Sequence, residues 1–407
     1  MNKGHVVNRS SSLWTTIVLG AAAFLLVLAV VSAPESAFQA SLQALKLWWN
    51  IVFPALLPFL VLIEIIIAYG WAHGVGILLN PFMRKVFKIS GSGGTVLITG
   101  MIAGFPAGAQ ISTSLIKQGE LGVKEAGKLA ALSHFCNPMT ILVVVGVGLL
   151  HQPAAGYFLL IVHWIAGWLA AWSFSFKQPR LGSAETGHSV ATKKYIKQTK
   201  SASLLLRAAN AASKARVRDG RSFGKLLGDS VTRSVQTLMM TGGFIMIFAV
   251  IVKVLSTYLF PYASSYVAGV LEIHIGTQTI SESTFHSTSI QLALLSAVLA
   301  WSGISGHLQS MSVLPADSIK WTVFVGKRLL HTVYAFSLAL IFWKPAALIS
   351  SAVHPAFSTT PQQTAQHEHV LSLWSNLYSV LKWQMITFFM FICLLVIASR
   401  IISRLSR

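Results

Sequence analysis

The sequence predicts an all-α polytopic membrane protein, because the chain is strongly apolar and its apolar residues lie in long runs. Of the 407 residues, 54% are hydrophobic and 10% are charged, whereas a soluble globular chain carries about 25% charged residues. A membrane helix needs about 20 consecutive apolar residues. Six runs reach that length and two shorter ones reach it with their flanks, which predicts about eight membrane segments: 13–33, 47–69, 153–176, 235–260, 290–313 and 373–399, with 139–150 and 329–343 as the shorter pair.

The first apolar run resembles a signal peptide, but Pro34 follows it directly, and proline just after a scissile bond is poorly cleaved. We therefore predict that residues 1–46 form an uncleaved N-terminal anchor helix and a short loop. The two cysteines, Cys136 and Cys393, lie in or beside apolar runs. They support neither a disulfide framework nor a zinc site.

The net charge of +20 comes to a large extent from residues 177–230, where lysine and arginine far outnumber aspartate and glutamate. Loops on the cytoplasmic side of a membrane carry such an excess of basic residues. The segment is therefore predicted to be a basic cytoplasmic loop and not a nucleic-acid-binding region, although the same bases also suit anionic lipid headgroups.

Residues 100–118 place glycine, proline and hydroxyl groups inside this apolar chain. Breaks at Gly104, Pro106 and Gly108 leave backbone groups that hydrocarbon cannot satisfy. Broken helices at membrane depth are typical of transporters. Because a full span here would carry the basic loop outside, the charge bias favours a re-entrant hairpin.

A second segment, residues 301–314, echoes residues 103–115, since both contain two spaced glycines followed by amide and hydroxyl side chains. Each segment follows an apolar run with a break, at Pro54 and Pro58 in the first half and at Gly242 and Gly243 in the second. Matched interruptions predict two broken or re-entrant helical hairpins in an inverted-repeat arrangement. Full spanning by 290–313 is the alternative; it would place the C-terminal arginines inside, as the charge bias prefers.

Glu64 lies within the apolar run 47–69. An acid at that depth is a functional candidate by default, here for carrying a coupling ion, and a structural hydrogen bond to a neighbouring helix is the alternative. The sequence has no Walker motif, no metal-ligand spacing and no nucleophile paired with a base. We therefore expect no enzyme activity, no metal and no cofactor.

Several motifs together resemble those of a known family. They are Gly-Phe-Pro-Ala-Gly-Ala-Gln at 104–110, Gln-Gly-Glu-Leu at 118–121, Cys-Asn-Pro at 136–138 and Thr-Gly-Gly-Phe-Ile-Met-Ile-Phe at 241–248. The chain from about residue 47 to 400 resembles the sporulation integral membrane protein family, which is related to concentrative nucleoside transporters. That family has two nucleoside-recognition, or gate, regions. Its spore-forming members are associated with moving dipicolinic acid from the mother cell toward the forespore, across the outer forespore membrane.

Together with the resemblance, the apolar runs and the charge pattern predict five regions: the anchor at 1–46, a first gate repeat at 47–176, the basic loop at 177–230, a second gate repeat at 231–345, and a polar loop with a C-terminal membrane helix at 346–407. The resemblance also implies a location in the cell membrane or the outer forespore membrane. The expected partners are a small anionic substrate, a coupling proton or sodium ion, and membrane lipid. A homo-oligomer is compatible with this reading, whereas nucleic acid is not expected.

Dipicolinate carries two carboxylates on an aromatic ring, so its site needs backbone N–H groups at helix ends, hydroxyls, amides and an aromatic face. The candidate substrate-binding residues are Gly104, Phe105, Pro106, Gly108, Gln110, Ser112, Asn137, Ser302, Gly303, Ser305, Gly306, His307 and Gln309. The simpler explanation for the small residues is close helix packing in lipid, and for Asn137 it is helix capping. The alternative functions are a nucleoside or other metabolite carrier and a membrane scaffold for sporulation.

Overall fold

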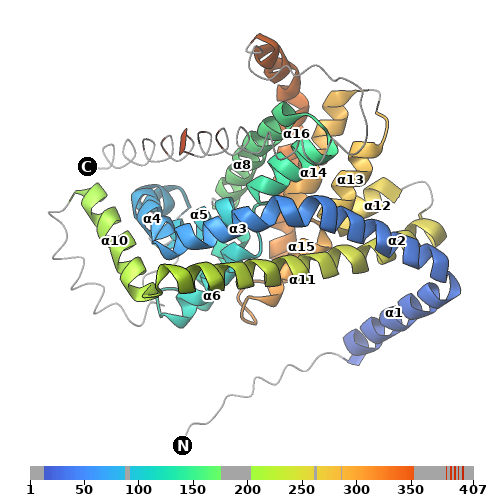
Figure 1. Ribbon diagram of the computed structural model, residues 1–407, viewed down its shortest axis with the longest axis horizontal. Helices are drawn as coiled ribbons and strands as arrows, with labels where there is room; N and C mark the ends of the chain where they lie inside the picture. The colour runs from blue at the N-terminus through green and yellow to red at the C-terminus, as the bar shows by residue number, and fades with distance from the viewer. Residues whose placement is uncertain are drawn as a thin grey trace, which may run out of the picture.

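The computed structural model describes residues 13–87, 92–175, 203–260, 264–285 and 287–352, together with six separate positions between 382 and 397. Every regular element in these residues is helical (Figure 1). In chain order they are α1 (Leu13–Ser32), α2 (Pro34–Leu47), η1 (Trp48–Val52), α3 (Phe53–Ala68), α4 (Trp71–Phe82), η2 (Met83–Phe87), α5 (Gly93–Ala103), α6 (Ala107–Lys117), α7 (Val123–Leu132), η3 (Thr140–Leu149), α8 (Pro153–Ser175), α10 (Leu204–Asp219), α11 (Phe223–Tyr258), α12 (Ser264–Leu271), α13 (Ile273–Glu282), α14 (Thr288–Trp301), α15 (Gly303–Ser312) and α16 (Trp321–Ala352).

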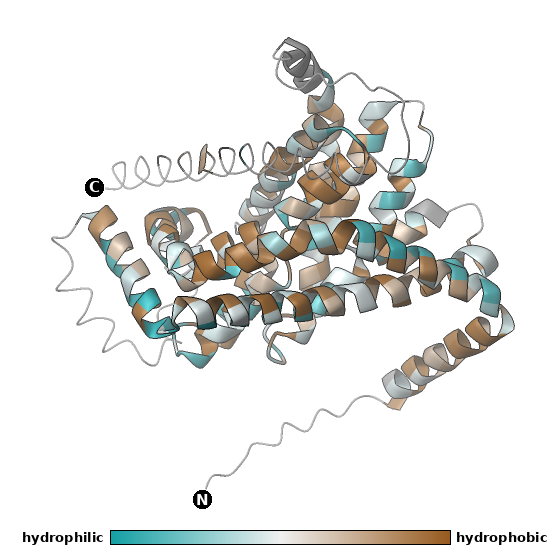
Figure 2. Cartoon of the chain, in the orientation of Figure 1, coloured by the Kyte–Doolittle hydropathy of each residue, from teal (hydrophilic) through white to brown (hydrophobic). Residues whose placement is uncertain are grey.

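Five helical stretches in the described residues are long and apolar enough to cross a membrane: Pro34–Ala68, Pro153–Ser173, Phe223–Tyr258, Thr288–Ser312 and Trp321–Lys344. Figure 2 shows apolar residues, in brown, along these long helices. The expectation of an all-helical membrane protein is thus confirmed, while the count of eight segments stays a prediction. Nearly all of the expected span 373–399, and of the region 346–407, lies outside the described residues.

The predicted loop after the N-terminal anchor is wrong, because residues 34–47 form α2, which continues through η1 into α3. Pro34 occupies the first turn, where a missing N–H costs nothing, and Glu35 and Lys46 carry favourable charges at the two ends. The irregularity expected near Pro54 appears as the π-helical segment η1, and α3 then runs on through Pro58.

The basic region 177–230 is not a loop throughout, since it contains α10 and the start of α11. The Ser203 side chain caps α10 by accepting the Leu206 N–H at 3.3 Å, and Gly220 ends the helix in the left-handed conformation. Because α10 packs on α4 and contacts α3, half of the basic segment is part of the folded helical body.

The expected break at Gly242 and Gly243 is also wrong, because α11 passes through both residues without interruption. The Trp48 ring of η1 lies directly over Gly242, where a Cβ atom would be 2.6 Å from its Cε2 atom. Glycine is needed there for close packing between helices, and not for a turn.

Small residues also bring α8, α14 and α16 together into a second group of helices. Ala166, Ala300 and Ala335, one from each helix, are fully buried against one another. Larger side chains such as Trp164 and Leu142 fill the adjoining core. The long helix α11 packs along α2 and α3, and these helices lie across the second group in Figure 1.

Two helical hairpins are formed by short helices that pack against each other. Residues 104–106 join α5 to α6, and Glu272 alone joins α12 to α13. Two further breaks separate successive helices that do not fold back on each other. Residues 133–137, the first break, separate α7 from η3, and Ser302, the second break, separates α14 from α15.

The expectation that residues 301–314 form a hairpin tip is therefore wrong. Ser302 and Gly303 both have left-handed backbone angles, with φ of +66° and +69°, which ends α14. Yet α14 and α15 do not pack on one another, and together they form the candidate span Thr288–Ser312. The segment that resembles residues 103–115 in sequence thus breaks a helical stretch that is long and apolar enough to span, and the second hairpin tip lies at Glu272.

Candidate functional site

Each hairpin tip lies against one of the broken helices. Gly104 has φ of +78°, and a Cβ atom there would be 2.8 Å from the Asn137 backbone nitrogen. Similarly, a Cβ atom on Gly303 would be 2.8 Å from the Leu271 carbonyl oxygen, at the second tip. Only glycine permits both the backbone conformation and the close approach.

Asn137 connects the first tip to the first break through both ends of its amide. Its Nδ2 donates to the Ala103 carbonyl at 3.1 Å, and its Oδ1 accepts the Met139 N–H at 2.7 Å. The side chain therefore satisfies the end of α5 and the start of the next helix at once. The capping interpretation of Asn137 is confirmed, and the residue also lines the cavity described below.

His134, which is buried, connects the two broken segments. Its ring stacks on Phe105 with 4.6 Å between centroids. Nδ1 lies 2.9 Å from the Ser310 hydroxyl and Nε2 lies 2.7 Å from the Ser302 hydroxyl. Arg328 of α16 donates to the carbonyls of His134 and Ala131, which fixes the end of α7 from the other side.

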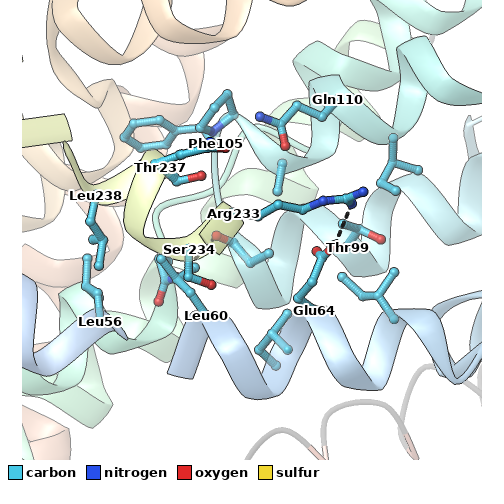
Figure 3. Close-up of a pocket in the computed structure, with 18 of the residues that line it drawn as sticks. Leu56, Leu60, Glu64, Thr99, Phe105, Gln110, Arg233, Ser234, Thr237 and Leu238 are labelled. Carbon is cyan, nitrogen blue, oxygen red and sulfur yellow. Dashed lines mark hydrogen bonds and ion pairs between the residues drawn. The ribbon is translucent and has the colours of Figure 1, made fainter. Parts of the chain in front are cut away.

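A cavity of about 750 Å³ opens beside this junction. Its walls come from α3, α6, α11, the 136–140 segment and the start of α13. In Figure 3, Phe105 and Gln110 lie on one side, Leu60 and Glu64 of α3 lie on the other, and Arg233 extends between them from α11. Both apolar and polar side chains from distant parts of the sequence thus face the same space.

Six of the residues singled out in the sequence line this cavity: Glu64, Phe105, Pro106, Gln110, Asn137 and Gln309. The other candidates lie behind it, where they shape the helices: Gly104, Gly108, Ser112, Ser302, Gly303, Ser305, Gly306 and His307. Gly108 packs on Ser133, and the Ser112 hydroxyl donates to the Gly108 carbonyl at 3.0 Å. His307 Nε2 lies 2.8 Å from the Trp301 carbonyl. For these residues the close-packing explanation fits the observed contacts.

Glu64 is neither isolated nor deeply buried, because its carboxylate pairs with Arg233 at 2.9 Å and its side chain is 29% exposed. This ion pair joins α3 to α11 across the cavity (Figure 3). The predicted hydrogen bond to a neighbouring helix is therefore present, and a role in ion coupling stays a prediction.

The turn between α10 and α11 adds further charges to the cavity wall. Arg221 pairs with Asp219 at 2.7 Å and with Asp229 at 3.1 Å. The hydrogen bond from Arg221 holds the pKa of the Asp219 carboxyl below its ordinary value. Arg218, which also lines the cavity, pairs with Glu120 at 3.2 Å. The cavity lining therefore includes three guanidinium groups, those of Arg218, Arg221 and Arg233, and each is paired with a carboxylate.

Sequence reasoning missed two buried residues at the second hairpin tip. Glu272 is 1% exposed, and His274, beside it, is 5% exposed and lines the cavity. An acid in the apolar stretch Val-Leu-Glu-Ile at 270–273 was the available signal, since the same reasoning had singled out Glu64. In the described residues, no group of three or more His, Cys, Asp or Glu side chains is placed to hold a metal ion.

Two comparisons with known proteins identify relatives of this chain. Residues 50–153 match the family model Gate, described as nucleoside recognition. Over 349 residues the chain is 34% identical to the sporulation integral membrane protein YlbJ of Bacillus subtilis (strain 168). The aligned region covers 81% of this chain and 83% of that protein. The chain belongs to the sporulation integral membrane protein family. No solved structure matches it. The matched gate region contains α5, α6 and the first break, and thus the Phe105 side of the cavity.

Proposed function

We propose that this chain is a secondary or facilitative transporter of a small anionic metabolite, and that the metabolite is dipicolinic acid moved from mother cell toward forespore. The observation that carries the proposal is the composition of the cavity. An aromatic face from Phe105, amides from Gln110, Asn137 and Gln309, and guanidinium groups surround about 750 Å³. A flat ring with two carboxylates needs these groups together.

The start of α6 adds a backbone contribution at the same place. Ala107 is the first residue of α6 and lines the cavity, together with Pro106 and Gln110. The N-terminus of a helix carries a partial positive charge and unpaired N–H groups, which favour a bound carboxylate. The first hairpin tip is thus suited to one carboxylate. The other would bind to an arginine of the cavity lining, such as Arg233, that exchanges its own carboxylate partner for the substrate.

Membership of a sporulation protein family supports the outer forespore membrane as the location. A nucleoside is the second candidate substrate, because the gate model is described as nucleoside recognition. An aromatic ring among amides would also hold a nucleobase. A scaffold in spore assembly would need none of these polar groups facing a cavity.

Transport by the purified full-length chain in liposomes tests the proposal. Dipicolinate entering the vesicles is measured by the luminescence of its complex with terbium sealed inside, and uridine is offered as the competing substrate. We expect dipicolinate uptake that uridine does not inhibit. Uridine uptake without dipicolinate uptake would instead support the nucleoside carrier, and transport of neither would favour the scaffold.

A pair of variants links the flux to the cavity. Ala107→Leu places a larger side chain on the cavity wall, whereas Ala316→Leu adds the same bulk at an exposed position away from it. We expect Ala107→Leu to lower uptake at normal abundance and Ala316→Leu to leave it unchanged. The same variants, placed in a Bacillus subtilis strain lacking YlbJ, should differ in spore dipicolinate content.

A further inference from the structure

The geometry points to His274 as the residue that binds the substrate anion together with one proton, so that each substrate crosses with a proton. This inference rests on the proposed transport function and adds the means of coupling to it. His274 lies at the second hairpin tip. Glu272 joins α12 to α13 there, and His274 is the second residue after it.

The Glu272 carboxylate is held by two N–H donors in a buried position. One oxygen lies 2.9 Å from Nδ1 of His274, and the other accepts the Ile275 backbone N–H at 2.8 Å. The Glu272 side chain is 1% exposed and the His274 side chain is 7% exposed. Because both carboxylate oxygens have partners, the carboxylate and the imidazole ring are fixed relative to each other.

This hydrogen bond determines which ring nitrogen of His274 is free. A carboxylate accepts, so Nδ1 carries hydrogen, and Nε2 is the nitrogen that gains or loses a proton. His274 lines the cavity, and Nε2 has no hydrogen-bond partner among the described residues. A neutral Nε2 repels a carboxylate lone pair, whereas a protonated Nε2 donates to it. Substrate and proton therefore bind together.

The elements packed on α13 carry other charged or titratable side chains that could bind a substrate carboxylate. They are α11, α12, α14, α15 and η3. Their charged or titratable side chains are Lys225, Asp229, Arg233, Lys253 and Tyr258 on α11, Tyr266 on α12 and His307 on α15, with Cys136 before η3 and Glu282 on α13 itself. Arg233 lines the same cavity but is paired with Glu64, and His307 is hydrogen-bonded to Trp301.

The proton balance is simple. A proton from the solution on the loading side forms the N–H bond at Nε2, and this N–H donates to a substrate carboxylate. After the protein changes conformation, substrate and proton leave on the other side, and Nε2 is again unprotonated. No residue is chemically altered in the cycle, and one proton is carried with each substrate.

Accumulation at equilibrium tests the coupling without depending on rates. Liposomes containing the full chain are held at zero membrane potential with potassium and valinomycin, with the outside about one pH unit more acidic. One proton per substrate then predicts about tenfold accumulation of dipicolinate, since a tenfold proton gradient is matched by a tenfold substrate gradient. We expect His274→Gln to equilibrate dipicolinate without accumulating it.

Two further variants keep the outcome decisive. His151→Asn, at an exposed position outside the cavity, should accumulate like the wild type. Glu272→Gln keeps an acceptor for Nδ1 of His274 but removes the negative charge of the carboxylate. This variant should accumulate dipicolinate well below tenfold even if His274→Gln does not fold.

The other outcomes distinguish the coupling residue from the transport function. Tenfold accumulation by both His274→Gln and Glu272→Gln would overturn the inference and leave the transporter assignment intact. Loss of accumulation in Glu64→Gln alone would assign the proton to Glu64. No dipicolinate uptake by the wild type would refute the proposed function itself.

Discussion

Gly104 shows how one residue holds the candidate site together. Its φ of +78° is left-handed, and it lies where the first tip meets Asn137. Gly119 has a similar φ of +70°, but no atom lies within 4 Å of its potential Cβ position. Alanine at Gly119 pays the cost of a positive φ, about 1–3 kcal/mol. Alanine at Gly104 pays at least as much, because its ψ of −169° gives a backbone conformation that essentially only glycine adopts. We expect Gly104→Ala to lower the unfolding temperature in detergent clearly more than Gly119→Ala. Equal losses would show that the contact with Asn137 is dispensable.

Asp219 gives the turn between α10 and α11 a defined pH dependence. The hydrogen bond from Arg221 holds its pKa below the ordinary value of 3.8. A carboxyl with a lowered folded-state pKa stabilises the fold above its unfolded-state pKa, and this contribution is lost as the pH falls through the folded value. We expect Asp219→Asn to lower the unfolding temperature at neutral pH, by an amount that shrinks below about pH 4. The exposed Asp317→Asn is the control for the loss of a carboxylate outside this ion pair, and a pH-independent loss in Asp219→Asn would refute the ion-pair explanation.

Packing of α11 against η1 depends on one of two adjacent glycines. A Cβ atom on Gly242 would be 2.6 Å from Trp48 Cε2, whereas Gly243 has no atom within 4 Å. The Trp48 Nε1 group also donates to the Leu238 carbonyl at 2.9 Å. We expect Gly242→Ala to separate the helices and lower the unfolding temperature. Gly243→Ala should raise it slightly, because alanine favours a helix over glycine by about 1 kcal/mol. The intrinsic tryptophan fluorescence of the protein should change in Gly242→Ala and stay at the wild-type value in Gly243→Ala.

The same two glycines show what the sequence can and cannot predict about an element. Long apolar runs identify α11 and α14 as membrane helices, because length and hydropathy are local properties. Whether Gly242 breaks a helix or fits a neighbouring ring depends on Trp48, which is far away in the chain. Segment 301–314 was expected to contain a break, and the break occurs at Ser302. The prediction that this segment is a hairpin tip was wrong. A glycine-rich segment can occur at the tip of a hairpin or at a break within a continuous helix, and the sequence does not distinguish the two.

At the scale of the whole molecule, the candidate cavity is built by both halves of the chain. Phe105 and Asn137 were predictable from the first break, since polar and aromatic groups at a membrane kink indicate a site. His274 and Arg218 were not, because their place in the wall depends on how α12, α13 and α10 pack. The inverted-repeat arrangement stays a prediction, now with the tip at Glu272 as the proposed counterpart of the tip at Gly104.

The Glu64–Arg233 pair connects these two halves across the cavity. The pair is partly exposed, at 29% and 62% of the two side chains, so its own strength is about 0.2–1 kcal/mol. Neutralising Glu64 frees Arg233 for the substrate anion. We therefore expect Glu64→Gln to tighten dipicolinate binding by up to about fivefold at low salt, with the gain fading as salt screens the charges.

Calorimetric titration of the purified protein with dipicolinate measures this effect, with Glu35→Gln on α2 as the control for a lost surface charge. Arg233→Gln should weaken binding, and the double variant should bind more weakly than Glu64→Gln, because the freed guanidinium is then absent. The opposite outcome is that Glu64→Gln weakens dipicolinate binding whether or not Arg233 is present. The Glu64 carboxyl group would then contact the substrate itself, and the arginines of the cavity lining would not be the groups that select an anion.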